Sequence, residues 1–240
     1  MEPLNIFLGE FLGAALLITL GCGVVANTIL TKSGMKHGAP SVQITFGWGF
    51  AVMLPVFTFA GLSGAHFNPA VTLGQMIVGN TTFAELPIYL IGQFGGTFTG
   101  AVIVWALFKD HLDENEDVGA KLGVFSTGPS VPNPARNVLS EIAGTFILVF
   151  ALMGIDNTAG IPPGLGFVFV WAIIVSIGMS LGGLTGYAIN PARDWGPRIA
   201  HSILPIKNKG DSNWGYAWVT MVGPLVGGAL AALLFSVLPF

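Results

Sequence analysis

The chain has 240 residues, of which 52% are hydrophobic and 9% are charged, and its mean hydropathy is +0.74. This composition excludes an ordinary soluble globular domain. The net charge is −3 and the basic side chains form no stripe, so nothing indicates a nucleic-acid partner. The single cysteine, Cys22, excludes an internal disulfide and offers no metal cluster.

Six segments are apolar and long enough to cross a bilayer, which needs roughly 20 mostly apolar residues. They are about 5–29, 41–60, 86–108, 137–157, 164–183 and 214–238. No basic region or obvious cleavage site accompanies the first segment, so we expect a retained span rather than a signal peptide. Small residues four positions apart, for example Gly92, Gly96 and Gly100, favour close helix packing in lipid. The pattern predicts an all-α membrane protein with six transmembrane helices.

The tripeptide Asn-Pro-Ala occurs twice within apolar sequence, and each copy follows a Gly-rich segment. The motif residues are Asn68, Pro69, Ala70, Asn190, Pro191 and Ala192. The segments 61–67 and 183–189 are too Gly-rich and interrupted for a regular helix. Irregular backbone at membrane depth is tolerated only where it is buried or lines a water-filled cavity. The paired motifs therefore predict a pore.

Each motif also makes a good start for a short helix. Asparagine is a favoured N-cap, and proline at the first helical position loses no hydrogen bond. The apolar pieces that follow, about 69–78 and 191–201, have ~10 residues and are too short to span a bilayer. We expect two re-entrant half-helices that enter from opposite faces and meet at their N-termini.

The two halves of the chain carry matching features, since Glu10 opens the first span and Glu141 the fourth. Each half has three spans, an odd number, so the second half must enter the bilayer in the opposite sense. We predict one membrane channel domain, 1–240, built from inverted repeats at about 5–108 and 137–238 that the loop 109–136 joins. Such repeats place the working site near the bilayer midplane.

A third Asn-Pro-Ala, followed by arginine, occupies 133–136 in the polar loop. No Gly-rich re-entrant segment precedes it, and we expect no short half-helix after it. Pro129, Pro132 and Pro134 exclude a regular helix in this loop. We interpret this copy as a coincidental turn without a role in the pore.

The context of the paired motifs resembles a known family. Residues 63–71 (SGAHFNPAV) and 186–198 (GYAINPARDWGPR) are similar to the two signature motifs of the aquaporin superfamily, in its glycerol-facilitator branch. The resemblance covers essentially the whole chain. Asp194 directly after Arg193, and the Phe-Ser-Thr tripeptide at 125–127, resemble that branch rather than the water-only channels.

The resemblance implies a passive channel in the cell membrane, of the bacterial kind, that forms homotetramers with one pore per subunit. It implies conduction of glycerol and other small uncharged solutes with some water, exclusion of ions and protons, and no cofactor or metal. By position, the family's selectivity filter falls on Trp48, Gly178, Tyr187 and Arg193. Tyr187 replaces the family's phenylalanine and adds a hydroxyl that can donate and accept, so the solute preference can differ. Thr220-Met221 is a second departure, because glycerol channels tend to have Pro-Leu there.

Elementary electrostatics supports the same positions. Each half-helix presents about half a positive charge at its N-terminus, and Arg193 adds a charge that stays protonated, so cations meet a barrier. Carbonyl groups of the re-entrant segments can form a ladder of acceptors for a polyol, as in the selectivity logic known for aquaporin-type pores. They are the carbonyls of Gly64, Ala65, His66, Gly186, Tyr187 and Ala188.

Three carboxylates have two interpretations each. A carboxylate inside a span is a functional candidate by default, so Glu10 and Glu141 could couple protons. Their matched positions favour structural braces that accept hydrogen bonds from the re-entrant segments. We likewise interpret Asp194 as a first-turn charge that holds a loop rather than as a solute contact.

A passive glycerol channel is the leading interpretation of these features. A channel of the same fold that prefers water, or that conducts lactic acid or dihydroxyacetone, is the alternative, and a proton-coupled secondary transporter is a further one because inverted repeats occur there too. No nucleophile–base pair or metal-ligand spacing lies within the spans, so we do not expect an enzyme.

The basic residues bear on the orientation in the membrane. All nine Lys and Arg residues lie in the connections before the second, fourth and sixth spans. The positive-inside rule would place those connections in the cytoplasm. The resemblance implies the opposite, with both termini in the cytoplasm, and we adopt that orientation.

Overall fold

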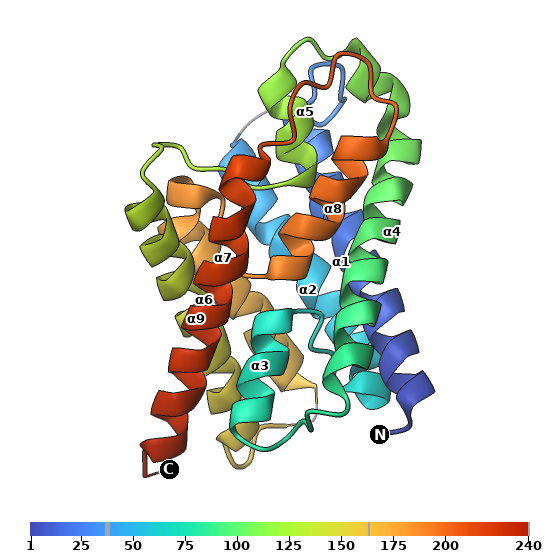
Figure 1. Ribbon diagram of the computed structural model, residues 1–240. Helices are drawn as coiled ribbons and strands as arrows, with labels where there is room; N and C mark the ends of the chain where they lie inside the picture. The colour runs from blue at the N-terminus through green and yellow to red at the C-terminus, as the bar shows by residue number, and fades with distance from the viewer. Residues whose placement is uncertain (37–38, 163, 240) are drawn as a thin grey trace.

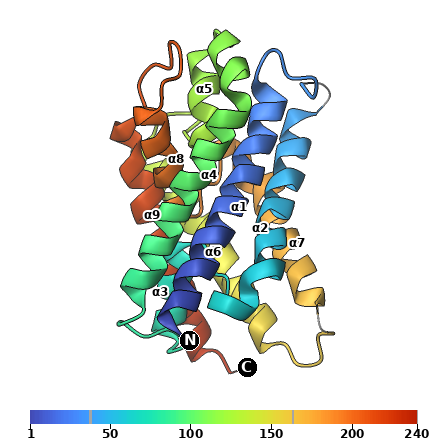
Figure 2. The same ribbon diagram turned by 90° about the vertical axis from the view of Figure 1, so that its right-hand side faces the viewer.

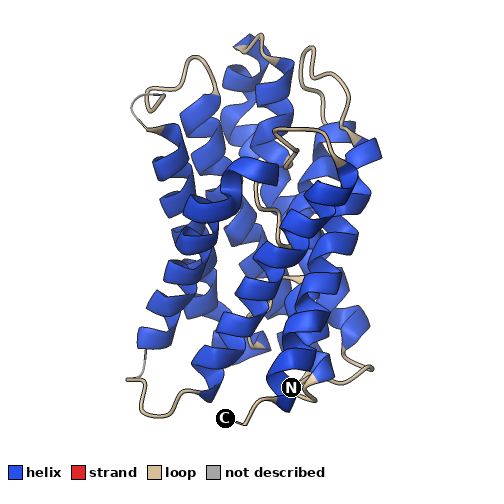
Figure 3. Ribbon diagram, turned by 90° about the vertical axis from the view of Figure 1, so that its left-hand side faces the viewer, coloured by secondary structure: helices blue, strands red, loops and turns tan. Residues whose placement is uncertain are grey.

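The computed structural model describes residues 1–36, 39–162 and 164–239 of the chain. This part of the protein forms nine helices and no strand (Figures 1 and 3). The helices are α1 Pro3–Ile29, α2 Pro40–Ser63, α3 Pro69–Ile77, α4 Leu86–Glu114, α5 Val118–Phe125, α6 Pro134–Asn157, α7 Leu165–Thr185, α8 Pro191–Ile203 and α9 Trp214–Val237. The predicted all-α class is confirmed.

Six of these helices are long and apolar enough to cross a membrane, with 21 to 29 residues each. They are α1, α2, α4, α6, α7 and α9, and they stand side by side in a bundle (Figures 1 and 2). Their bounds lie within a few residues of the predicted spans, except that α4 continues to Glu114 beyond a kink at Phe108. The chain is therefore a multi-pass membrane protein.

Glycines bring the long helices into backbone contact. α4 packs against α1, and a Cβ atom at Gly96 would lie 2.2 Å from the carbonyl oxygen of Phe11. α9 packs against α6 in the same way, because a Cβ atom at Gly227 would lie 2.4 Å from the carbonyl oxygen of Ile142. Close van der Waals contact drives helix association in lipid, so these two helix pairs form the frame of the bundle.

The two half-helices, α3 and α8, begin at the prolines of the paired motifs. Asn68 Oδ1 accepts a hydrogen bond from the backbone N–H of Ala70, and Asn190 Oδ1 accepts from those of Ala192 and Arg193. Figures 1 and 2 show α3 near the end that carries both termini and α8 nearer the other end. The N-termini of both helices are directed toward the middle of the bundle, as expected.

The third Asn-Pro-Ala also starts a helix, which corrects its interpretation as a turn. Asn133 Oδ1 accepts a hydrogen bond from the backbone N–H of Arg136 at 3.1 Å, and α6 begins at Pro134. The prolines do not exclude this helix, because Pro134 occupies the first helical position, where proline is tolerated. Another short helix, α5, precedes them in the same loop.

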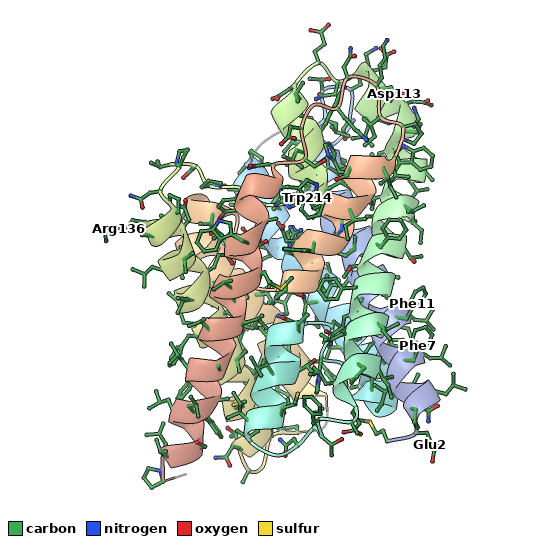
Figure 4. The ribbon with its side chains drawn as sticks, in the orientation of Figure 1. Glu2, Phe7, Phe11, Asp113, Arg136 and Trp214 are labelled. Carbon is green, nitrogen blue, oxygen red and sulfur yellow. The ribbon has the colours of Figure 1, made fainter. Side chains whose placement is uncertain are left out.

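The polar connections lie at the two ends of the bundle. Figure 4 places Glu2 at the end with both termini, and Asp113 and Arg136 toward the opposite end. The nine basic residues all lie toward this second side. They occupy α8, α5, the ends of α4 and α6, and the connections between helices. The bundle thus has one end with basic residues and one without, and its orientation in the membrane stays a prediction.

Candidate functional site: a cavity between the two halves

A cavity of about 490 Å³ runs between the two halves of the chain. It extends from Asn80 and Asp156, near the end with the termini, past both motifs to Arg193. Part of its wall is aliphatic and comes from five helices, including Leu17, Val52, Val71, Leu148 and Ile174. The rest includes the irregular segments 64–68 and 187–190, so apolar side chains and backbone polar groups share the lining.

Both irregular segments hold residues other than glycine at positive φ. Ala65 and Phe67 have φ of 54° and 49°, and Tyr187 and Ile189 have φ of 38° and 44°. This conformation is uncommon outside glycine, and it is a genuine outlier for a β-branched residue such as Ile189. Each such residue costs about 1–3 kcal/mol and persists only where the surroundings over-determine it. Other contacts must therefore hold these segments in place.

Glu10 holds the first segment. Its carboxylate is fully buried and accepts hydrogen bonds from the backbone N–H groups of His66 and Phe67, at 2.9 and 2.7 Å. The Ser63 hydroxyl donates to the same carboxylate at 2.7 Å. Sequence reasoning missed a fourth donor, the Gln93 amide, which reaches Glu10 at 2.8 Å from α4. A carboxylate that accepts from four donors is suited to hold the irregular segment in place.

Glu141 holds the second segment in a matching way. It accepts from the backbone N–H groups of Ala188 and Ile189, at 3.1 and 2.8 Å, and from the Thr185 hydroxyl at 2.7 Å. The strained Ile189 is thus bonded through its own N–H. Hydrogen bonds of this kind to an ionised group are stronger than neutral ones, so they can offset the backbone strain.

The motif asparagines tie the two segments together. Asn68 Nδ2 donates to the carbonyl oxygen of Ile189, and Asn190 Nδ2 donates to that of Phe67, both at 2.8 Å. An amide group has two N–H donors, so each asparagine keeps one for the cavity that both residues line. The two half-helix N-termini add positive potential at the same place.

The carbonyl groups expected to form the ladder lie on these segments. Gly64, Ala65, His66, Tyr187 and Ala188 line the cavity, whereas Gly186 does not. Within the described part of the chain, no hydrogen bond uses the carbonyl oxygen of any of these six residues. The acceptors on the cavity wall are therefore available to a solute.

Arg193 and Trp48 meet at the far end of the cavity. The guanidinium carbon lies 3.9 Å from the centre of the tryptophan ring, a cation–π contact. Arg193 Nη1 also donates to the carbonyl oxygen of Phe125 at 3.3 Å. Sequence reasoning noted Phe125 only as part of a tripeptide, and the structure adds its carbonyl as a support for the arginine.

Gly178 and Tyr187 are adjacent, but they contribute differently to the site. A Cβ atom at Gly178 would lie 2.9 Å from Tyr187 Cζ and 2.6 Å from Thr45 Cγ2. Tyr187 lines the cavity and Gly178 does not, so the glycine makes room for the ring. The Tyr187 hydroxyl oxygen is buried next to Thr45 and has no hydrogen-bond partner within 3.5 Å among the described residues. It therefore points away from any solute in the cavity.

Asp194 is fully buried and lies outside the cavity lining. It accepts from the backbone N–H of Thr127 at 2.8 Å and pairs with Arg198 one turn later. These contacts connect it to the loop after α5. Among the described residues, no group of three His, Cys, Asp or Glu side chains is placed to hold a metal ion.

Comparison with known proteins assigns the family. Residues 1–235 match the family described as Major intrinsic protein. The chain is 50% identical to glycerol uptake facilitator protein 3 of Lactiplantibacillus plantarum, over 99% of each protein. It is 47% identical to the glycerol uptake facilitator protein of Bacillus subtilis, over 96% of this chain and 83% of the relative. The solved structure of the aquaglyceroporin from Plasmodium falciparum has a TM-score of 0.88 and 29% identity, over 99% of this chain and 97% of the other.

Six spans, two half-helices and a cavity between the two halves define a polytopic membrane protein of the channel class. The chain belongs to the major intrinsic protein family, as the resemblance implied. This family is a class of membrane channels, and the bacterial relatives named above are glycerol uptake facilitators.

Proposed function

We propose that the chain is a passive channel that conducts glycerol and other small uncharged solutes, with some water, down their concentration gradients. One observation carries the proposal: the cavity combines an aliphatic wall with backbone carbonyls and amide donors. A polyol has hydroxyl groups along one edge and CH groups along the other, so it suits such a lining. The names of the relatives support glycerol as the solute.

The filter is formed by Trp48, Gly178, Tyr187 and Arg193. The guanidinium donates to solute hydroxyls, while the rings of Trp48 and Tyr187 face the CH groups. Gly178 acts indirectly by admitting the Tyr187 ring. Lactic acid and dihydroxyacetone have three carbons and similar polar edges, so they belong in the same test panel.

Cations are excluded because positive potential gathers at two places. Arg193 carries the positive charge of its guanidinium group, and the two half-helix N-termini each present about half a positive charge at the motif asparagines. The remaining N–H groups of Asn68 and Asn190 donate to a passing water or hydroxyl. That orientation interrupts a chain of water molecules that could carry protons.

The braces and the assembly complete the proposal. Glu10, Glu141 and Asp194 serve as structural acceptors, and the repeats 5–108 and 137–238 form one channel domain with its termini in the cytoplasm. We also propose that it forms homotetramers with a pore in each subunit. Fixed donors hold both intramembrane carboxylates, which opposes proton coupling and favours a channel over a secondary transporter.

Stopped-flow light scattering on proteoliposomes tests the proposal. Vesicles with the protein should admit glycerol far faster than empty vesicles, with dihydroxyacetone, urea, lactic acid and water as the panel. An uncoupler should leave the initial rate unchanged. Glycerol entry no faster than in empty vesicles would contradict the proposed solute, and a rate that falls with the uncoupler would favour a transporter.

A further inference from the structure

Asp194 follows the filter arginine and joins three separate segments. Its Oδ2 accepts from the backbone N–H and the hydroxyl of Thr127, at 2.8 and 2.9 Å. Arg198 Nε donates to Oδ1 at 2.8 Å, and its Nη2 donates to Oδ2 at 3.0 Å. The remaining partner comes from α9, because the Thr220 hydroxyl lies 2.9 Å from Oδ1. Asp194, Arg198 and Thr220 are all fully buried.

The segment that Asp194 holds reaches the filter. Phe125 lies two residues before Thr127, and its carbonyl oxygen accepts from Arg193 Nη1 at 3.3 Å. Arg198 Nη2 donates to the Thr127 carbonyl oxygen at 2.9 Å. The backbone N–H and the carbonyl group of Thr127 are therefore both bonded to residues of α8. The position of the Arg193 guanidinium therefore depends on a carbonyl whose position depends on Asp194.

The Thr220 hydroxyl has one proton and two possible acceptors. Asp194 Oδ1 and the carbonyl oxygen of Ala217 both lie at 2.9 Å. A hydrogen bond to an ionised carboxylate is roughly twice as strong as one between neutral groups, so the proton goes to Asp194. A carboxylate fully removed from water needs each of its donors.

We propose that Thr220 is a positioning residue of the filter. It fixes Asp194 against the segment 125–127, and through the Phe125 carbonyl it fixes the guanidinium of Arg193. This inference rests on the proposed function as a glycerol channel. A three-carbon polyol must contact the guanidinium and the facing rings at once, whereas water needs only one partner. A loosened Arg193 therefore lowers glycerol permeability more than water permeability.

The test compares Thr220→Val, which removes the hydroxyl, with Thr220→Ser, which keeps it. In proteoliposomes, Thr220→Val should lower the ratio of glycerol to water permeability by about threefold, as expected for loss of one hydrogen bond, and Thr220→Ser should restore the ratio. Thr145→Val is the matched control, since Thr145 is also fully buried and its hydroxyl donates only to the carbonyl oxygen of Glu141 one turn earlier. An unchanged ratio in Thr220→Val, or an equal fall in Thr145→Val, would overturn the proposal.

A second variant keeps the test decisive if Thr220→Val does not fold. Thr127→Val removes the hydroxyl group that donates to Asp194 from the segment 125–127, and it keeps the backbone N–H donor. It should lower the same ratio, and an unchanged ratio would again overturn the proposal. The unmodified protein is measured first. No glycerol flux above empty vesicles would contradict the channel function itself, whereas flux with an insensitive ratio would contradict only the role of Thr220.

Discussion

At the scale of single residues, Tyr187 departs from the family pattern without placing a new polar group on the cavity wall. Its ring lines the cavity, while its hydroxyl is buried next to Thr45. Tyr187→Phe should therefore change glycerol permeability by less than about twofold, which corresponds to a small barrier difference. Stopped-flow measurement checks this, with Tyr216→Phe as the control because that hydroxyl is also buried without a partner among the described residues. A large shift between glycerol and lactic acid would show that the hydroxyl reaches the solute.

Gly178 provides a sharper test of the filter. A Cβ atom there would collide with the Tyr187 ring and with Thr45, and overpacking of this kind costs about 1–3 kcal/mol. Gly178→Ala should displace the ring into the cavity and lower glycerol permeability by about tenfold, with a smaller loss for water. Gly183→Ala on the same helix is the control, because a Cβ atom at Gly183 meets no atom within 4 Å. Equal losses of water and glycerol would indicate general blockage instead.

Replacing Glu10 distinguishes a structural brace from a proton-coupling residue. Glu10→Gln replaces one acceptor oxygen by an NH₂ group. That group faces either the Ser63 hydroxyl and the His66 N–H, or the Phe67 N–H and the Gln93 amide. An unsatisfied buried polar group costs about 1–3 kcal/mol, so folded yield and the thermal midpoint in detergent should fall, while Glu2→Gln at an exposed position should change neither. Normal stability together with a lost pH dependence of flux would support proton coupling.

At the scale of elements, the same three residues can start a helix with or without a pore. Asn133 caps α6 as Asn68 caps α3, but only Asn68 reaches across to the other half, through the Ile189 carbonyl. Asn133→Ala should therefore cost about 1 kcal/mol of stability through loss of the cap and leave glycerol flux unchanged. Asn68→Ala should lower flux as well, in the same stopped-flow assay. Equal effects on flux would mean that capping alone explains the paired motifs.

The elements that could be predicted from the sequence are those set by local rules. Span lengths follow from apolar runs, and the start of each half-helix follows from the preferences of asparagine and proline at N-caps. The interpretation of the loop failed at Pro134 because three prolines were taken to exclude a helix, although one of them occupied its first position. The start of this helix could therefore have been predicted from the sequence, by considering the position that each proline would occupy in a helix.

Contacts between distant segments could not be predicted in this way. Gln93 meets Glu10 from 83 positions away, and the Phe125 carbonyl meets Arg193 from 68 positions away. The direction of the Tyr187 hydroxyl depends on the space left by Gly178, which no pattern in one sequence reveals. The residues that we propose for the filter were predicted through the family resemblance, whereas the contacts that support them required the structure.

At the scale of the whole molecule, the basic residues bear on the orientation in the membrane, because the positive-inside rule opposes the orientation that we propose. Three of them are buried and have structural contacts: Arg193 and Arg198 in α8, and Lys121, which donates to the carbonyl oxygen of Lys207. Lys32 and Lys109 pair with carboxylates at the same end. The positive-inside rule counts Lys and Arg residues in short loops and near the ends of the spans. These five residues also have structural contacts at the end of the bundle where they lie.

Passive conduction through one pore between the two halves of the chain can be tested by measuring how glycerol is distributed at equilibrium. Proteoliposomes are loaded with equal glycerol inside and outside, and a proton or sodium gradient is then imposed. Internal glycerol should stay equal to external glycerol under either gradient, because the buried carboxylates are held by fixed donors and cations meet Arg193 and two helix N-termini. Accumulation above the external concentration that disappears with the gradient would contradict passive conduction.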